Sequence, residues 1–451
     1  MKGNAAMKDW KIVYDTYCKA VEQIYASVQP FVDYSLVCDR EKDDNYYMIT
    51  LKLDASNEGY SIHADKRADG EQYITITAKD EIYLMYAASD FRNKYLPFER
   101  KFCNEWPVHH FAKPFVDEVE PYHLDTKPRI KQRGLWTWGY VIYDYKKYID
   151  HMVTLKFNTL IIWNDYVPEN MKEVIAYAHE NGVSLYLGFA WGWDVDCKTG
   201  ISASREELTA QVVDNYEKNY AALGCDGIYF QSFTELDQED VDGVPIADAV
   251  TDFVNVTGNR LLQKYPDLKL LFGLHANSVK RKLDVIQKVD PRIAIIWENL
   301  GSFPYHNNPS TTEHFPETLD LTKQVKYLRK EGDFGVVLKG ITTLNWSTFK
   351  HQKGSFLLGV SGKDQIDKIR RNRQDMLRYV QAYWIRNAKY ALEIIKEFGE
   401  DDMVTALNED SIFEEIINYP IALCAQMMWD SDRSVDEILS ETALMPDVTF
   451  V

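Results

Sequence analysis

The sequence predicts an α/β protein in which a (β/α)8 TIM barrel follows a small α+β domain. Three observations lead to this prediction. The chain has 451 residues, which is more than one ordinary domain. After residue 133, short apolar runs recur at intervals of roughly 25 to 45 residues, with helical stretches between them. These runs are almost continuously apolar, which is typical of parallel strands buried on both faces.

The N-terminal segment, residues 1–128, is expected to form the α+β domain. Residues 48–54, 59–66 and 72–80 alternate apolar and polar side chains, and the turn "ADG" between the last two predicts a small antiparallel sheet. Residues 81–98 have helical spacing, and Pro97 is expected to stop this helix. Residues 112–132 contain several prolines and no periodicity, which predicts a connector to the next domain.

The barrel is expected between residues 129 and 400. Its eight predicted strands are residues 134–138, 159–163, 184–189, 227–230, 268–274, 293–297, 334–339 and 355–360. The stretch 364–398 is expected to be a helix that closes the barrel, with one apolar face made by Leu377, Val380, Trp384, Ala388, Ala391 and Ile395. Residues 401–451 are expected to form a helical extension. A doubly wound sheet is the alternative arrangement of the same strands.

Composition excludes several classes of function. A formal net charge of -18 argues against nucleic acid or anionic membrane partners, which are bound through clustered Lys and Arg. The six cysteines lie far apart without a CxxC pair, so we expect reduced thiols and no metal site. The N-terminus has no apolar signal region, and no stretch could span a bilayer. We therefore expect a cytoplasmic protein, or a secreted one if a signal peptide has been removed, that needs no cofactor.

Tryptophan gathers where an active site is expected. In such a barrel the C-terminal ends of the strands form the catalytic face. Seven of the 11 tryptophans fall at or just after these predicted ends: Trp136, Trp138, Trp163, Trp191, Trp193, Trp297 and Trp346. Flat indole faces suit the apolar face of a sugar ring, so we expect sugar binding. The alternative is that they pack the top of the barrel.

Carboxylates share these strand ends. Glu235 follows the fourth predicted strand and Glu298 the sixth, and a glycosidase needs one carboxylic acid to protonate the leaving oxygen and a second group as base or nucleophile. The alternatives are a helix cap for Glu235 and a structural hydrogen bond for Glu298. Five further polar side chains are candidates for binding substrate hydroxyls: Asp165, His275, Asn277, Asn345 and His351.

The segment "RGLWTWGYVIYDYKKYIDHMVTLKFNTLIIWND" resembles the first barrel repeat of the hexosaminidase and α-glucuronidase group, glycoside hydrolase families 20, 67, 84 and 115. The preceding "GYSIHADKRADGEQYITITAKDEIYLMYAASDF" is similar to the accessory domain of that group. In family 20 an Asp-Glu pair ends strand 4, and the matching pair here is Thr234-Glu235. The resemblance therefore implies that the acid, Glu235, is retained without its Asp partner. In the α-glucuronidases a lone Glu after strand 4 is the acid, and "IIWEN" resembles their later acidic strand end.

Together these features predict an exo-acting glycoside hydrolase that cleaves one terminal sugar from an oligosaccharide or glycoside, of a glucuronidase-like or neutral-sugar type. Arg133, Lys339 and His351 are the cations expected to pair with a uronate carboxylate. Inversion is expected if the carboxyl groups of Glu235 and Glu298 lie roughly 6.5 to 9.5 Å apart. The alternatives are an N-acetyl-hexosaminidase, a non-catalytic carbohydrate-binding barrel, and a lyase or isomerase. The sugar, its anomer and any homo-oligomer stay open.

Overall fold

The computed structural model describes residues 8–32, 36–67, 70–96, 98–103, 106–111, 118–164, 166–192, 203–233, 239–241, 243–275, 282–299, 315–342, 354–360, 374–408 and 412–450. The chain divides into two compact units. The first consists of Met1–Pro128, Val153–Lys156 and Ser440–Val448, and the second of Arg129–Met152, Phe157–Leu439 and Thr449–Val451. No helix within the described ranges combines the length and the apolar character needed to cross a membrane.

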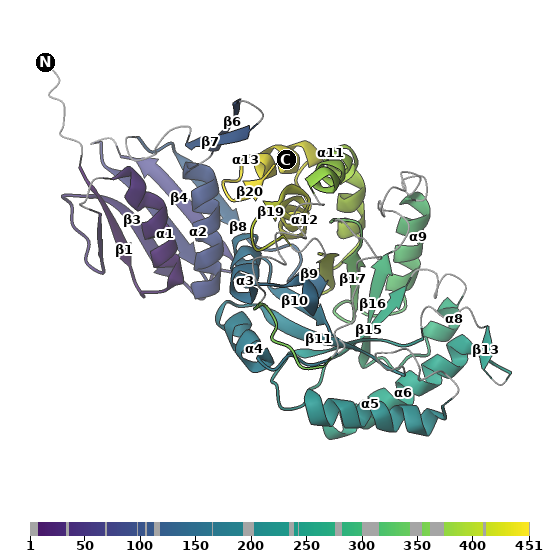
Figure 1. The fold of residues 1–451 in the computed structure, drawn as a ribbon. Coiled ribbons are helices and arrows are strands. Elements are labelled where there is room, and N and C mark those ends of the chain that lie inside the picture. Colours follow the sequence, from purple (N-terminus) through teal and green to yellow (C-terminus); the bar gives the residue numbers. More distant parts are fainter. Residues whose placement is uncertain are drawn as a thin grey trace, which may run out of the picture. The chain divides into compact units, whose positions relative to one another are not determined.

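The first unit is a mixed sheet with two helices on one face (Figure 1). The strands run in the order β2-β1-β3-β5-β4-β8. The elements are β1 (Trp10–Tyr14), α1 (Lys19–Val28), η1 (Gln29–Phe31), β2 (Val37–Asp39), β3 (Tyr47–Leu53), β4 (Tyr60–Lys66), β5 (Gln72–Ala78), α2 (Glu81–Tyr95), β6 (Phe98–Cys103), β7 (Trp106–Phe111) and β8 (Tyr122–Thr126). The helix α2 begins after Asp80, whose carboxylate accepts a hydrogen bond from the Tyr83 backbone N–H at 2.9 Å.

The predicted antiparallel sheet is correct for only one of its two pairings. β4 and β5 are antiparallel neighbours, but β3 and β5 pair in parallel. The reason is the strand order β3-β5-β4: β5 lies between the other two strands, so β3 does not pair with β4, the next strand along the chain. The predicted connector is also partly wrong, because β8 lies within it and pairs with β4.

The second unit is a closed barrel of eight parallel strands surrounded by helices (Figure 1). Its strands are β9 (Gln132–Trp138), β10 (Thr159–Trp163), β11 (Ser184–Ala190), β12 (Gly227–Gln231), β15 (Leu270–His275), β16 (Ile293–Asn299), β17 (Phe334–Leu338) and β18 (Met403–Leu407). The other elements are η2 (Gly139–Val141), α3 (Tyr145–Thr154), α4 (Met171–Glu180), α5 (Arg205–Asn219), β13 (Asp240–Val241), β14 (Val244–Pro245), α6 (Ile246–Lys264), α8 (Leu283–Ile286), α9 (Phe315–Lys326), α11 (Gln374–Lys396), β19 (Ile417–Asn418), α12 (Tyr419–Trp429), α13 (Val435–Leu444) and β20 (Val448–Thr449). The predicted fold class is confirmed.

The eighth strand is not the predicted one. Residues 354–360 form no barrel strand, and β18 instead pairs with β17 on one side and β9 on the other. In residues 354–360 only Leu358 is buried, whereas Leu357 is 51% and Val360 is 63% exposed. A barrel strand would need burial on both faces. The strand that closes the barrel therefore lies after residue 400, in the segment that was expected to be a helical extension.

The helix α11 confirms the apolar face expected for the closing helix. All six of its predicted apolar residues are buried: Leu377, Val380, Trp384, Ala388, Ala391 and Ile395. Trp384 also donates its indole N–H to the Gly340 carbonyl oxygen at 3.0 Å. The backbone that follows β17 is thus hydrogen-bonded to a helix that forms later in the chain.

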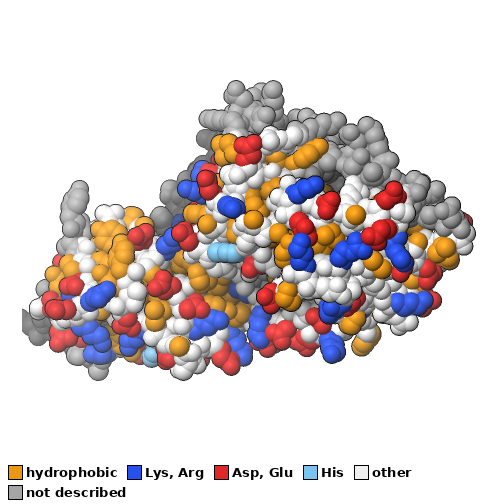
Figure 2. Space-filling model, turned by 90° about the horizontal axis from the view of Figure 1, so that it is seen from below, with side chains coloured by type: hydrophobic (Ala, Val, Ile, Leu, Met, Phe, Trp, Pro, Cys, Tyr) orange, Lys and Arg blue, Asp and Glu red, His pale blue; other side chains and the backbone are white. Residues whose placement is uncertain are grey.

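Charged side chains of both signs are interspersed on the face drawn in Figure 2. The ion pair between Arg260 of α6 and Glu206 of α5, at 3.0 Å, is an exposed example. Four cysteines in the described ranges, Cys18, Cys38, Cys225 and Cys424, are free thiols. Burial raises the pKa of Cys424 to about 12, so this thiol stays protonated at neutral pH.

Candidate functional site

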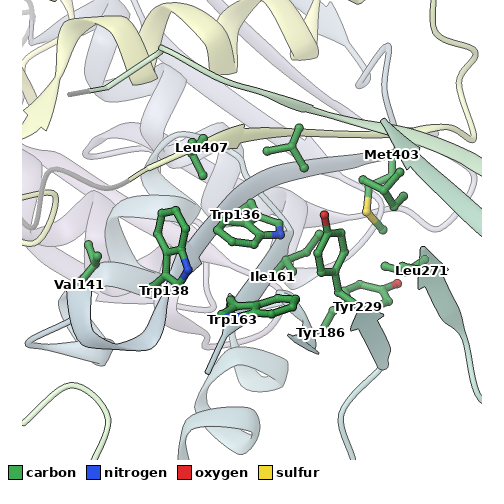
Figure 3. Packing of buried hydrophobic residues seen from close by; sticks show 12 residues of the cluster. Trp136, Trp138, Val141, Ile161, Trp163, Tyr186, Tyr229, Leu271, Met403 and Leu407 are labelled. Carbon is green, nitrogen blue, oxygen red and sulfur yellow. The ribbon is translucent and has the colours of Figure 1, made fainter. Parts of the chain in front are cut away.

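Four aromatic side chains line the C-terminal half of the barrel interior. We call Trp136 and Trp138 of β9, Trp163 of β10 and Tyr229 of β12 the aromatic wall (Figure 3). The Trp136 ring lies 4.8 Å from Trp138, 6.3 Å from Trp163 and 5.8 Å from Tyr229, measured between centroids. The three tryptophans are 4% to 8% exposed. They are the members of the predicted set that the structure brings together.

Two glycines make room for this wall. A Cβ added at Gly188 of β11 would lie 2.8 Å from Cε3 of Trp163, so the indole lies over β11. A Cβ added at Gly273 of β15 would collide with the Tyr229 hydroxyl oxygen and lie 2.9 Å from Oε1 of Glu298. A side chain at either position would therefore push the neighbouring group out of place.

Glu298 of β16 lies inside the barrel beside the wall and is 2% exposed. Its Oε1 accepts hydrogen bonds from the Tyr229 hydroxyl and from the Gln231 side-chain amide. Its Oε2 lies 2.6 Å from the Nζ atom of Lys339, which directly follows β17. We call these four residues the Glu298 network. Three side chains within the described residues thus bind its carboxylate.

Tyr229 is a donor in this network at any ordinary pH. Its side chain is fully buried, and burial raises the pKa of Tyr229 well above its usual range. The negative charge of Glu298 and the hydrogen bond to it raise the pKa of Tyr229 further. The phenol therefore keeps its proton and donates a hydrogen bond to the Glu298 carboxylate.

Three predicted site residues, Arg133, Trp191 and Trp297, lie away from the aromatic wall. Arg133, near the N-terminal end of β9, has its guanidinium 4.7 Å from the Trp429 ring centroid and donates to the carbonyl oxygens of Ile130 and Lys131. Five positions of strand, about 17 Å, separate it from Trp138 at the other end. The expected role of Arg133 in substrate binding at the barrel mouth therefore does not fit its position.

Trp191 and Trp297 point away from the barrel interior. Trp191 stacks on Phe230, with centroids 3.6 Å apart, and Phe230 is on the outer face of β12. Trp297 donates its indole N–H to Oγ1 of Thr322 in α9 at 3.0 Å. Both tryptophans are 0% exposed. They occupy the layer between strands and helices, as the packing alternative proposed.

The remaining predicted site residues lie outside the described residues: Glu235, Asp165, Trp193, Asn277, Asn345, Trp346 and His351. For His275 the structure describes only the backbone, which ends β15 and pairs in register with Glu298. Phe233, which precedes Thr234 and Glu235 in sequence, has a positive φ of 47°. Such a conformation costs a non-glycine residue about 1 to 3 kcal/mol and is common at functional sites.

Polar atoms without partners also mark this end of the barrel. Four strands are followed directly by a residue with a buried polar side-chain atom that has no hydrogen-bond partner within the part of the chain described: Asn164, Trp191, Ser232 and Asn408. Trp191 points away from the barrel interior, so these atoms lie at this end of the barrel without by themselves marking the interior site.

Sequence reasoning missed Tyr229, Gln231 and Gly273. A signal for two of them was present, because Gln231 is a polar residue that ends an apolar strand and lies two positions after Tyr229. Residues two apart in a strand share a face, so both could have been assigned to the side that carries the site. The need for glycine at 273 depends on side chains from two other strands and has no local signal.

No protein-family model matches the sequence, and no curated protein matches it significantly. Solved structures do match. The GH20 β-N-acetylhexosaminidase from Streptomyces coelicolor A3(2) is 12% identical, with a TM-score of 0.54 over 98% of this chain and 94% of that chain. A mutant Streptomyces plicatus β-hexosaminidase in complex with its product, GlcNAc, is 12% identical, with a TM-score of 0.53 over 99% and 94%. The GH20 exo-β-N-acetylglucosaminidase from Vibrio harveyi, in complex with N-acetylglucosamine, is also 12% identical, with a TM-score of 0.50 over 97% and 73%. The expected likeness to hexosaminidases is therefore confirmed at the level of the fold.

Proposed function

We propose that this protein is an exo-acting glycoside hydrolase whose site lies at the C-terminal end of the barrel. The observation that carries the proposal is a buried carboxylate, Glu298, directly beside an aromatic wall at that end. Acids and aromatic faces are what glycoside hydrolysis requires. The fold shared with hexosaminidases supports the same proposal of a glycoside hydrolase.

In the proposed mechanism Glu235 is the general acid and Glu298 the second carboxylate. Glu235 gives its proton to the glycosidic oxygen as the bond to the anomeric carbon breaks. Glu298, ionised beside Lys339, is the general base: it takes a proton from the water whose oxygen bonds to the anomeric carbon on the face opposite the leaving group, so inversion is the expected course. Trp136, Trp138 and Trp163 are the aromatic faces at this end of the barrel that would contact one terminal sugar.

The cations near the site favour a neutral sugar over a uronic acid. Of the three cations expected to pair with a uronate carboxylate, Arg133 contacts Trp429 and Lys339 is paired with Glu298. The third, His351, lies outside the described residues. A uronate would therefore have to compete with Glu298 for Lys339, which supports a substrate without a charge.

An N-acetyl-hexosamine is the second candidate substrate. The observation that favours it is that the matching structures are β-N-acetylhexosaminidases, two of them in complex with GlcNAc. Thr234 stands against it, since the resemblance places it where family 20 has the Asp that orients the acetamido group. A hydroxyl cannot supply that negative charge.

The test is a panel of nitrophenyl glycosides with neutral, N-acetylated and uronic sugars. Hydrolysis confined to neutral sugars supports the proposal. Robust hydrolysis of the N-acetylglucosaminide, with inhibition by a thiazoline analogue, would select the second candidate instead. Calorimetric binding of monosaccharides without turnover of any glycoside would indicate a non-catalytic carbohydrate-binding barrel.

A further inference from the structure

The Glu298 network surrounds one buried carboxylate with three side-chain donors, Tyr229, Gln231 and Lys339. We propose that Lys339 and Tyr229 are positioning residues, which keep Glu298 ionised and fix the orientation of its carboxylate, and that Gly273 is required for this contact. The effect of these residues on catalysis rests on the proposed glycosidase function. The ionised pair of Glu298 and Lys339 does not depend on that function.

The first step of the argument is electrostatic. A carboxylate taken out of water is strongly destabilised unless a cation accompanies it. The side chains of Lys339 and Glu298 are only 4% and 3% exposed, so water screens neither charge effectively. With Nζ and Oε2 2.6 Å apart, the pair is neutral as a whole, and the lysine stabilises the ionised form of the acid.

The second step is geometric. The Tyr229 hydroxyl starts on β12 and reaches Glu298 on β16, so it crosses the intervening strand β15. It crosses at Gly273, where any Cβ would collide with the hydroxyl oxygen. Because Tyr229 and Gln231 hold Oε1 and Lys339 holds Oε2, the carboxylate cannot rotate without breaking one of these contacts.

The groups around the acid come from both neighbouring strands, β15 and β17, and from β12 beyond β15. β12 contributes Tyr229, the residue after β17 is Lys339, and on β15 the backbone of His275 is the register partner of Glu298. On β16 itself the other interior residues are the apolar Ala294 and Ile296. Within the described residues, Lys339 is the cation that the structure pairs with Glu298.

The first experiment compares pH–rate profiles on the best nitrophenyl glycoside. In Lys339→Met the buried carboxylate has lost its cation and takes up a proton more readily, so the acidic limb is expected to move up by about 1 to 3 pH units. Lys339→Arg keeps the charge and is expected to restore the limb. An acidic limb unchanged in an active Lys339→Met enzyme would overturn the proposal.

Tyrosine variants provide a matched pair. Tyr229→Phe removes the hydroxyl that contacts Glu298 and is expected to lower kcat about tenfold. Tyr186→Phe removes a hydroxyl from another buried tyrosine of the same interior cluster, on β11, and is expected to leave kcat unchanged. Gly273→Ala is expected to match Tyr229→Phe. Equal effects of Tyr229→Phe and Tyr186→Phe would count against a positioning role, even if Lys339→Met does not fold.

A second experiment measures thermal stability against pH and does not require an active enzyme. In Lys339→Met the unpaired Glu298 binds a proton more tightly in the folded than in the unfolded chain, so its stability falls as pH rises. The difference in Tm between wild type and Lys339→Met is therefore expected to widen from pH 4.5 to pH 8. A constant difference would overturn the ionised pair. A widening difference in a protein that hydrolyses no glycoside would instead reject the proposed function and keep the pair.

Discussion

Tyr229 and Phe230 are adjacent in β12 and serve opposite faces of the barrel. Tyr229 faces the interior and contacts Glu298, whereas Phe230 stacks on Trp191 behind the strand. The same alternation separates Glu298 from Trp297, which contacts α9. In an almost continuously apolar run both faces look alike, so the sequence located the strand ends but did not assign their side chains to the interior.

At the residue scale, Glu235→Gln is expected to lower turnover of unactivated glycosides by orders of magnitude, because an amide cannot protonate the leaving oxygen. Substrates whose leaving groups need no proton should lose much less. Steady-state kinetics on the two substrate types measure the difference. The control is Glu239→Gln, an exposed acid of the same segment, and a Glu235→Gln enzyme no slower than this control would rule out the assignment.

At the element scale, Lys156 contacts both the helix α2 and the strand β4 of the first unit. Lys156 has a positive φ of 62° and a side chain that is 2% exposed. Its Nζ lies 2.8 Å from Oδ1 of Asp90 in α2 and 3.1 Å from the Tyr60 hydroxyl of β4, and that hydroxyl also contacts Asp90. The carboxylate of α2 is thus held by the sheet and by a residue contributed from later in the chain.

Lys156→Met should destabilise the protein by about 3 kcal/mol, because it leaves the Asp90 carboxylate without its cation in a largely buried position. Denaturant unfolding measures this as a lower midpoint. Lys127→Met, in the same unit, removes one side of the exposed ion pair with Glu58 and is expected to cause no measurable change. Equal midpoints for the two variants would show that the Lys156 contact contributes nothing.

At the scale of the whole molecule, barrel closure depends on a strand late in the chain. β18 lies between β17 and β9, and its Thr405 donates a hydrogen bond to the Val336 carbonyl oxygen at 3.1 Å. Without β18 these two neighbours would each present an unpaired edge.

A chain that ends at residue 400 is therefore expected to aggregate or to lack a cooperative unfolding transition, whereas the full chain unfolds cooperatively. Size-exclusion chromatography and thermal unfolding followed by circular dichroism test this. A monomeric 1–400 fragment with the Tm of the full chain would show that residues 403–407 are dispensable.

The sequence by itself determined the fold class and seven of the barrel strands, because these depend on local periodicity and strand order. It also located Trp136, Trp138, Trp163 and Glu298 at one end of the barrel. Only the tertiary structure decided that β18 closes the barrel, that β3 and β5 run in parallel and that Lys339 pairs with Glu298. These contacts join residues far apart in the chain, and their free energy depends on which side chains meet. Gly273 illustrates the difference, since its missing Cβ has meaning only where Tyr229 and Glu298 meet above it.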